Sequence, residues 1–440
     1  MKRNIYLMYA IAFLQGMVFY GPVATLYRQA CGVSVFQITV IESISLFLCI
    51  LLEVAWGVAA DRIGYKKTMV FCCVLYFLSK IVFWRASGFG GFLAERVMLS
   101  VVIAGLSGVD TSILYLSCQR QNKNYQNKAE SSRGEGESGR NETESGWSEG
   151  EGSRNERENG GNEAESGQSE NESSGNGIEN SHQVFGMYNS LQMAGLLAAS
   201  AVFSLFVGEN YRLAGFLTAL SYGGAAVLSL GLTEVSREGA DRICFSRFKE
   251  TLVCTLKDRR LLLFLLAVAL LTETHQTVTV FLNQLQYEKC GLGNAAIGYI
   301  YIAATLLGMC GVYSARLTKK AGFKAAGLLF GGTAACSCAM LALSAKALPS
   351  VCAILVLRIS NSLFQPFQTE IQNRLVHTEY RATALSIHAM LLDSVGVGTN
   401  LAFGALAKNS LAAAFWFGAG VCLAGMALMS CAGHRMFQKF

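Results

Sequence analysis

The sequence lacks the motifs that carry most catalytic and redox chemistry. It has no Gly-x-x-x-x-Gly-Lys-Ser/Thr loop, which excludes a P-loop for ATP. Its fourteen cysteines show no metal-ligand or disulfide-framework spacing and lie mainly in apolar runs, where they are small packing residues. No nucleophile–base pattern stands out. We therefore expect no enzyme, no cofactor and no bound metal.

Charged residues are also scarce, at 15% of the chain, whereas hydrophobic residues make up 52% and the mean hydropathy is +0.37. A bilayer core about 30 Å thick needs roughly 20 apolar residues per helix. In lipid only helices and closed barrels satisfy every backbone group, and these runs lack the alternation of barrel strands. The sequence therefore predicts an all-α membrane protein with twelve transmembrane helices. They are expected near 4–26, 36–59, 68–84, 91–118, 184–207, 213–233, 261–284, 293–315, 325–345, 349–373, 382–406 and 411–433.

The basic residues are distributed by membrane side. If the spans alternate from a cytoplasmic N-terminus, 27 of the 36 Lys and Arg fall in cytoplasmic segments and only six in external ones. This follows the positive-inside rule. We expect a multi-pass protein of the cytoplasmic membrane with both termini cytoplasmic. The net charge of +6 thus reflects orientation in the bilayer and gives no reason to expect nucleic acid as a partner.

A short charged stretch separates the second and third apolar runs and predicts a tight turn. It reads Gly57-Val-Ala-Ala-Asp61-Arg62-Ile-Gly64-Tyr-Lys66-Lys67. A partial copy of this stretch follows the eighth run, from Gly311 to Arg316, with Ala315 at the position that corresponds to Asp61. Equivalent turns in equivalent hairpins indicate a duplicated six-helix unit. The expected domains are a six-helix bundle over 1–118 and 184–233, a cytoplasmic linker over 234–260, and a pseudo-symmetric six-helix bundle over 261–440.

This stretch resembles the hallmark cytoplasmic loop of the major facilitator superfamily, a family of secondary transporters. That loop reads glycine, three residues, Asp-Arg-x-Gly and then basic residues. Bacterial members are also similar at Leu52-Glu53, at Ala94-Glu95, at Ser107-Gly108 and over 381–386. The chain departs from them in having Ala55 where a proline is usual. It also lacks the Gly-Pro motif of many drug–proton antiporters in its fifth run, which argues against drug export.

The resemblance implies two bundles that rock about a central site, with a conformational gate on the cytoplasmic side. Asp61 lies at the negative pole of a helix and needs a positive partner. The resemblance implies that it docks against the start of the eleventh span when that side is closed. The gate residues are expected to be Gly57, Asp61, Arg62, Gly64, Lys66, Lys67 and Arg381.

Segment 119–183 does not fit the family pattern. Much of it is a seven-residue repeat that reads roughly Glu-Ser-Gly-Arg-Asn-Glu-x. A coiled coil would need an apolar seam, which the repeat lacks. We expect a disordered acidic cytoplasmic loop. It is either a tolerated expansion or a tether for a cytoplasmic partner.

Ionisable residues at membrane depth are functional candidates by default. The seventh span carries Glu273-Thr-His275-Gln276, and both Glu and His can exchange protons when burial shifts their pKa values. The cluster is expected to couple protons or contact substrate, or else to be structural. Asp110 in the fourth span and Asp393 in the eleventh are further candidates.

A polar stripe at helical spacing marks the tenth span, and such a stripe is expected to line a cavity. Its members are Arg358, Asn361, Gln365 and Gln368. Arg358 would attract an anion or pair with Asp393. In the first half, Glu42, Lys80, Glu95 and Arg96 are expected to form structural ion pairs.

These features predict a secondary transporter for one small solute, monomeric in the lipid bilayer and coupled to protons. Import and export both stay open. The alternative is a membrane sensor or scaffold that uses the acidic loop as an interaction arm. A polar cavity between the halves favours transport, whereas a sealed apolar interface favours the scaffold.

Overall fold

The protein is described by a computed structural model that covers residues 2–106, 108–120, 184–235, 245–376 and 381–436. Several side chains lie outside this description, namely those of 54–55, 57–62, 245–247, 319–321, 323–324, 381–382 and 432–436. Twelve helices are long and apolar enough to cross a membrane, which confirms the predicted number. Within the described ranges the regular elements are all helical. The acidic repeat lies outside them.

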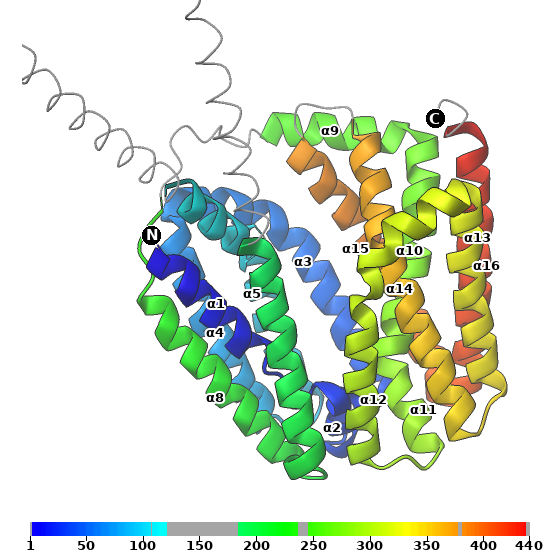
Figure 1. The fold of residues 1–440 in the computed structure, drawn as a ribbon, viewed down its shortest axis with the longest axis horizontal. Coiled ribbons are helices and arrows are strands. Elements are labelled where there is room, and N and C mark those ends of the chain that lie inside the picture. Colours follow the sequence, from blue (N-terminus) through cyan, green and yellow to red (C-terminus); the bar gives the residue numbers. More distant parts are fainter. Residues whose placement is uncertain (1, 107, 121–183, 236–244, 377–380, 437–440) are drawn as a thin grey trace, which may run out of the picture.

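The first half begins with a span in three pieces and continues with longer helices. Its elements are α1 (Lys2–Gly16), η1 (Gly21–Val23), α2 (Ala24–Ala30), α3 (Val35–Ile63), α4 (Tyr65–Arg85), α5 (Phe89–Leu106), the helical residues 109–120 and 184–202, the π-helical η2 (Phe203–Val207) and α8 (Tyr211–Leu230). The amphipathic α9 (Phe245–Lys257) then lies across one end of the molecule (Figure 1).

The second half repeats this plan with its own interruptions. Its elements are α10 (Arg259–Gln276), the π-helical η3 (Thr277–Leu282), α11 (Asn283–Lys289), α12 (Asn294–Leu307), the 3-10 helix η4 (Gly308–Tyr313), α13 (Ser314–Leu343), α14 (Ala347–Leu375), α15 (Arg381–Asn409) and α16 (Leu411–Met436). Asp258 caps α10, since its carboxylate accepts hydrogen bonds from the N–H groups of Arg260 (3.0 Å) and Leu261 (3.2 Å).

The helices of each half pack mainly on one another. The pairs α4·α5, α4·α8 and α13·α16 are extensive, whereas the halves meet through α3 on α15, α12 on η2 and α2 on α11. Both chain ends lie at the same end of the molecule, which we call the termini end (Figure 1). The other, the opposite end, carries the connections 31–34, 86–88, 208–210, 290–293 and 344–346.

The predicted turn over 57–67 is wrong in extent. Helix α3 continues to Ile63, and only Gly64 breaks it, with φ 98°. The loss of hydrophobicity after Trp56 does not end the helix, because alanine, aspartate and arginine are all compatible with one. A positive φ is open to glycine without steric strain, so Gly64 allows the reversal into α4. In the second half Gly322, with φ 72°, makes the corresponding break within α13, about one helical turn later relative to Gly311.

Two glycines allow the first and fifth spans to pack with their backbones in close contact. A Cβ on Gly16 would overlap the carbonyl oxygen of Gln192, and one on Gly195 would overlap that of Phe13. Small residues at such positions let two backbones approach closely, which is a principal source of helix association in lipid. The fifth span is therefore held against α1 by contacts that tolerate no larger side chain.

Several spans contain irregular helical segments: the first and seventh within their length, the eighth at η4, and the fifth over its last five residues. The first is broken around Pro22, and the fifth and seventh become π-helical at η2 and η3. Such irregular segments frequently mark functional sites, and in a membrane they occur where backbone faces protein or a cavity. Helix α14, in contrast, continues through Pro366.

Candidate functional site

A cavity of about 100 Å³ lies between the halves, in the part of the spans nearer the opposite end. One buried water needs roughly 10–15 Å³ by a comparable measure, so the cavity has room for several waters or a small organic solute. It is lined by Gly21, Pro22, Thr279, Val280, Asn283, Tyr287, Ile297, Tyr301, Ala304, Thr305, Ile354 and Arg358. Most of this lining belongs to the second half.

Helical spacing explains which side chains reach the cavity. Residues four apart lie on one helix face. In the seventh span Thr279, Asn283 and Tyr287 follow this spacing, and Ile297, Tyr301 and Thr305 follow it in α12. The cavity is therefore lined by one face of each of these two spans, polar except at Ile297, with Arg358 added from α14.

The halves contact one another on the opposite-end side of the cavity. Gln284 Oε1 accepts a hydrogen bond of 2.7 Å from the backbone N–H of Thr25. Nearer the loops, Asn294 Nδ2 donates to the hydroxyl of Tyr211 at 3.0 Å. The Thr39 side chain packs so tightly on Gly404 that no Cβ would fit there. These contacts close the opposite end.

Arg358 is the only charged residue among the residues that line the cavity. Its guanidinium lies along the backbone of Gly308 in the eighth span. Within the described ranges it has neither an ion pair nor a hydrogen bond, so the alternative in which it pairs with Asp393 is not realised. A half-buried cation thus faces the cavity without a protein partner.

Two carboxyl groups of the second half are also unpaired in the part of the chain that the structure describes. Glu273 is only 6% exposed and packs against Gly396 of α15. Asp393, one turn earlier on α15, is close enough to Glu273 and to Glu53 of α3 for their charges to interact. Glu53 accepts a hydrogen bond of 2.5 Å from Ser386. Glu273, Asp393 and Glu53 therefore lie on α10, α15 and α3, where α15 packs on both of the other helices.

The remaining candidates of the seventh and fourth spans lie apart from these acids. His275 is fully buried, with Nδ1 2.6 Å from the Leu271 carbonyl oxygen and its ring stacked near Phe364. Gln276 is exposed and lies one turn before Val280, on the cavity-facing side of the helix. Asp110 accepts a hydrogen bond of 3.3 Å from Tyr188 near the termini end.

The predicted stripe on the tenth span is divided in the structure. Arg358 lines the cavity, whereas Gln368 accepts a hydrogen bond of 3.1 Å from Thr272. Asn361 is partly buried, and its Oδ1 has no partner in the described part of the chain. Gln365 is exposed toward the termini end.

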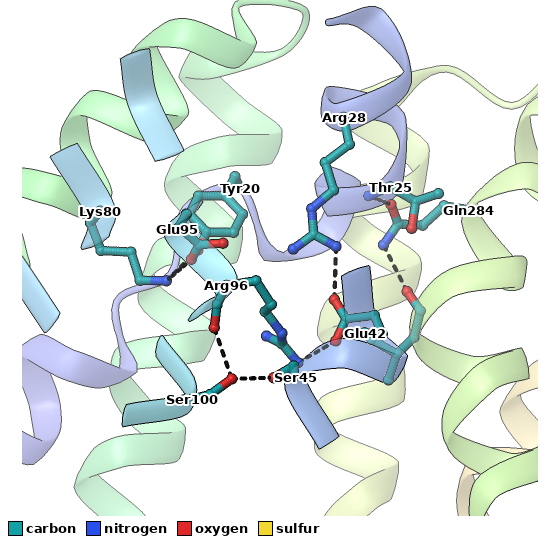
Figure 2. A network of polar contacts seen from close by, with 11 residues as sticks. Tyr20, Thr25, Arg28, Glu42, Ser45, Lys80, Glu95, Arg96, Ser100 and Gln284 are labelled. Carbon is teal, nitrogen blue, oxygen red and sulfur yellow. Dashed lines mark hydrogen bonds and ion pairs between the residues drawn. The ribbon is translucent and has the colours of Figure 1, made fainter. Parts of the chain in front are cut away.

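The first half contains a buried network of charges (Figure 2). Lys80 Nζ lies 2.9 Å from Glu95 and 3.0 Å from the hydroxyl of Tyr20. Glu42 is paired with Arg96 and, at 2.9 Å, with Arg28. The expected pairing of Glu42, Lys80, Glu95 and Arg96 is confirmed.

Arg28 follows the first predicted run and is one of the six basic residues expected in external segments, but α2 turns it inward and leaves it 5% exposed. Sequence reasoning also missed the cavity residues of the seventh and eighth spans. Asn283 and Tyr287 continue the face that begins at Gln276, and this spacing was the available signal.

The described residues include only part of the predicted gate motif. Gly64 and the helix that ends before it are placed, but the side chains of Asp61, Arg62 and Arg381 lie outside the described residues. Lys66 donates its backbone N–H to Glu234 at 3.2 Å. Lys67 is exposed at the start of α4.

No group of three or more His, Cys, Asp or Glu side chains suited to a metal ion occurs among the described residues.

Comparison with known proteins identifies the fold. Over nearly their full lengths, a point mutant of the nucleoside transporter NupG matches with a TM-score of 0.74 at 12% identity, covering 98% of this chain and 99% of that one. A D-xylose–proton symporter matches at 0.65 and 11%, covering 99% and 97%. A bacterial homolog of the human lysosomal transporter Spinster, inward-facing and unoccupied, matches at 0.61 and 14%, covering 98% and 94%.

No curated protein matches the sequence itself. At these identities the structural matches establish the fold alone. The family model of the Major Facilitator Superfamily, however, matches residues 178–399, just over half of the chain. With twelve membrane-spanning helices in the arrangement of those transporters, the chain belongs to the Major Facilitator Superfamily.

Proposed function

We propose that this protein is a proton-coupled secondary transporter that carries one small solute by alternating access. It works as a monomer in the cytoplasmic membrane, with both termini cytoplasmic. Residues 1–118 and 184–233 form one moving bundle and residues 261–440 the other. The observation that carries the proposal is the polar cavity at the interface of the halves.

A scaffold or sensor would be expected to seal that interface with apolar side chains. Instead, the interface holds hydroxyl, amide and guanidinium groups at membrane depth, which are expensive in lipid and are retained where they contact a solute. Nothing in the described site supports a covalent reaction. Transport therefore explains the residues better than a structural role.

The cavity is closed on its opposite-end side. The contacts of Thr25 with Gln284 and of Asn294 with Tyr211 close the opposite end, which the charge distribution assigns to the outside. Toward the termini end, Gln365 and Thr369 of α14 are exposed. A solute in the cavity would leave toward the cytoplasm.

Proton coupling is proposed for Glu273 and Asp393. Both acids lie near the contact of α3 with α15, where the halves must separate or close. Protonation there would change the repulsion among the three carboxyl groups and so bias one arrangement over the other. The fold match to a proton symporter is compatible with this assignment.

Purified protein in proteoliposomes is expected to take up at least one solute of a broad panel, and an imposed pH gradient is expected to raise the uptake. Radiolabelled solutes and protein-free vesicles provide the measurement and the baseline. Folded protein that moves no solute in either direction, with or without the gradient, would instead favour the scaffold.

The gate at the termini end is proposed to depend on Asp61. Asp61→Asn removes a charge that would cap the start of α15 in the closed state, and such a charge–dipole contact is worth about 1 kcal/mol. Uptake is expected to slow roughly fivefold, with expression unchanged. Glu209→Gln, at an exposed loop of the opposite end, is the matched control. Equal rates for Asp61→Asn and the wild type would contradict the gate.

A further inference from the structure

We infer that the transported solute is a small organic monoanion whose carboxylate is bound by Arg358. This inference rests on the proposed transport function and names its substrate class. It begins from the unpaired guanidinium in the cavity, which has no carboxylate partner within the described ranges.

A guanidinium that is partly withdrawn from water is unfavourable unless an anion or hydrogen-bond acceptors replace the lost hydration. Arg358 has neither in the described residues, although its planar fork is suited to bind a carboxylate through two parallel hydrogen bonds. The residues that line the cavity include no acid. The missing partner is therefore supplied by the solute.

The rest of the lining restricts the solute further. The hydroxyls of Tyr287 and Tyr301 and the amide of Asn283 can donate hydrogen bonds, whereas Ile297 and Ile354 offer apolar surface. A single cation neutralises one negative charge, so a dianion such as a phosphate monoester would leave one charge buried without a partner. A monocarboxylate with an apolar body and polar substituents fits these groups best.

The buried network of the first half adds a second, independent observation. It contains three cations, Arg28, Lys80 and Arg96, but only two carboxylates, Glu42 and Glu95. Arg28 and Arg96 share Glu42, and the network adjoins the cavity in the chain, because Tyr20, which binds Lys80, immediately precedes the lining residues 21–22. In a medium of low dielectric constant the surplus positive charge of the network favours an anion in the cavity.

The opposite substrate class, an organic cation, would have to use the acids of the second half. Glu273 packs on Gly396, and neither it nor Asp393 belongs to the cavity lining. These acids contact the moving interface instead. A cationic solute would therefore lie beside Arg358 and be repelled by it.

The test compares carboxylates with their neutral amides on the purified protein. Benzoate and benzamide, nicotinate and nicotinamide, and lactate and lactamide are matched in shape; phenyl phosphate serves as a dianion and benzylamine as a cation. Binding is measured by calorimetry and by the shift in melting temperature. At least one carboxylate is expected to bind, with its amide about tenfold to a hundredfold weaker, as for a lost charge-assisted hydrogen bond.

Arg358→Gln is expected to abolish the preference for carboxylate over amide, whereas Arg374→Gln, an exposed site on the same helix, is expected to keep it. Equal binding of amides, tighter binding of benzylamine, a preference that survives in Arg358→Gln, or no carboxylate binding in the panel would each overturn the inference. Vesicle uptake separates the transport proposal from the substrate inference. Uptake of an amide or an amine would support the transport function and contradict an anionic substrate. Binding of a carboxylate without uptake would support the anion site and contradict the transport function.

Discussion

Lys80→Met is expected to destabilise the folded protein by about 3–5 kcal/mol, because it leaves a buried carboxylate without its cation. Lys80 and Glu95 are 3% and 1% exposed, and their side chains lie 2.9 Å apart. Glu95 Oε2 already has no partner in the described part of the chain, so the variant would leave both of its oxygens unsatisfied. The measurement is thermal unfolding in detergent, where a fall of roughly 3–5 °C is expected for a chain of this length.

The double variant Lys80→Met with Glu95→Leu is expected to recover much of this loss, since replacing both partners by apolar groups removes the unpaired charge. Lys408→Met, at an exposed position near the end of α15, is the control for loss of one lysine and is expected to unfold like the wild type. A Lys80→Met protein as stable as this control would show that the pair is not required for folding.

Glu273→Gln is expected to abolish pH-driven accumulation of the solute, while exchange of solute across the membrane continues. Glutamine keeps the size and polarity of the buried side chain but cannot release a proton. A gradient of one pH unit drives about tenfold accumulation for one coupled proton, and this driven part is expected to disappear. Counterflow of labelled solute in proteoliposomes, with and without the gradient, measures both the exchange of solute and its pH-driven accumulation.

Glu288→Gln, an exposed acid toward the end of the same span, is expected to leave the tenfold accumulation of the coupled transporter intact. If Glu273→Gln also accumulates solute normally, proton coupling through Glu273 is ruled out. If exchange is lost together with accumulation, Glu273 is needed for the conformational change itself and not only for coupling.

The number of spans could be predicted from hydrophobicity because the bilayer imposes a minimum length on each apolar run. The end of α3 could not. Hydrophobicity reports where a chain leaves lipid, whereas Gly64 with its positive φ decides where the helix ends. The π-helical segments η2 and η3 could not be predicted either, since their apolar sequences differ little from those of ordinary spans.

The site was predicted in part. Intramembrane charge pointed to Arg358, Glu273 and Asp393, but their partners depend on helix rotation, which a polar stripe constrains only loosely. Arg28 shows the limit most clearly, because its position between two apolar runs suggested a loop, although its side chain is buried beside Glu42. Tyr301, an aromatic residue in an apolar run, carried no sequence signal of its own.

The glycine contacts between the first and fifth spans also have a bearing on biogenesis. Residues 119–183 separate the fourth span from the fifth along the chain, and a ribosome working at about 5–20 residues per second needs several seconds to make them. During that interval the fifth span, which packs on the α1 surface around Gly16, has not yet been made. The four spans already inserted must keep this backbone surface available, and correct assembly then depends on the late arrival of Gly195.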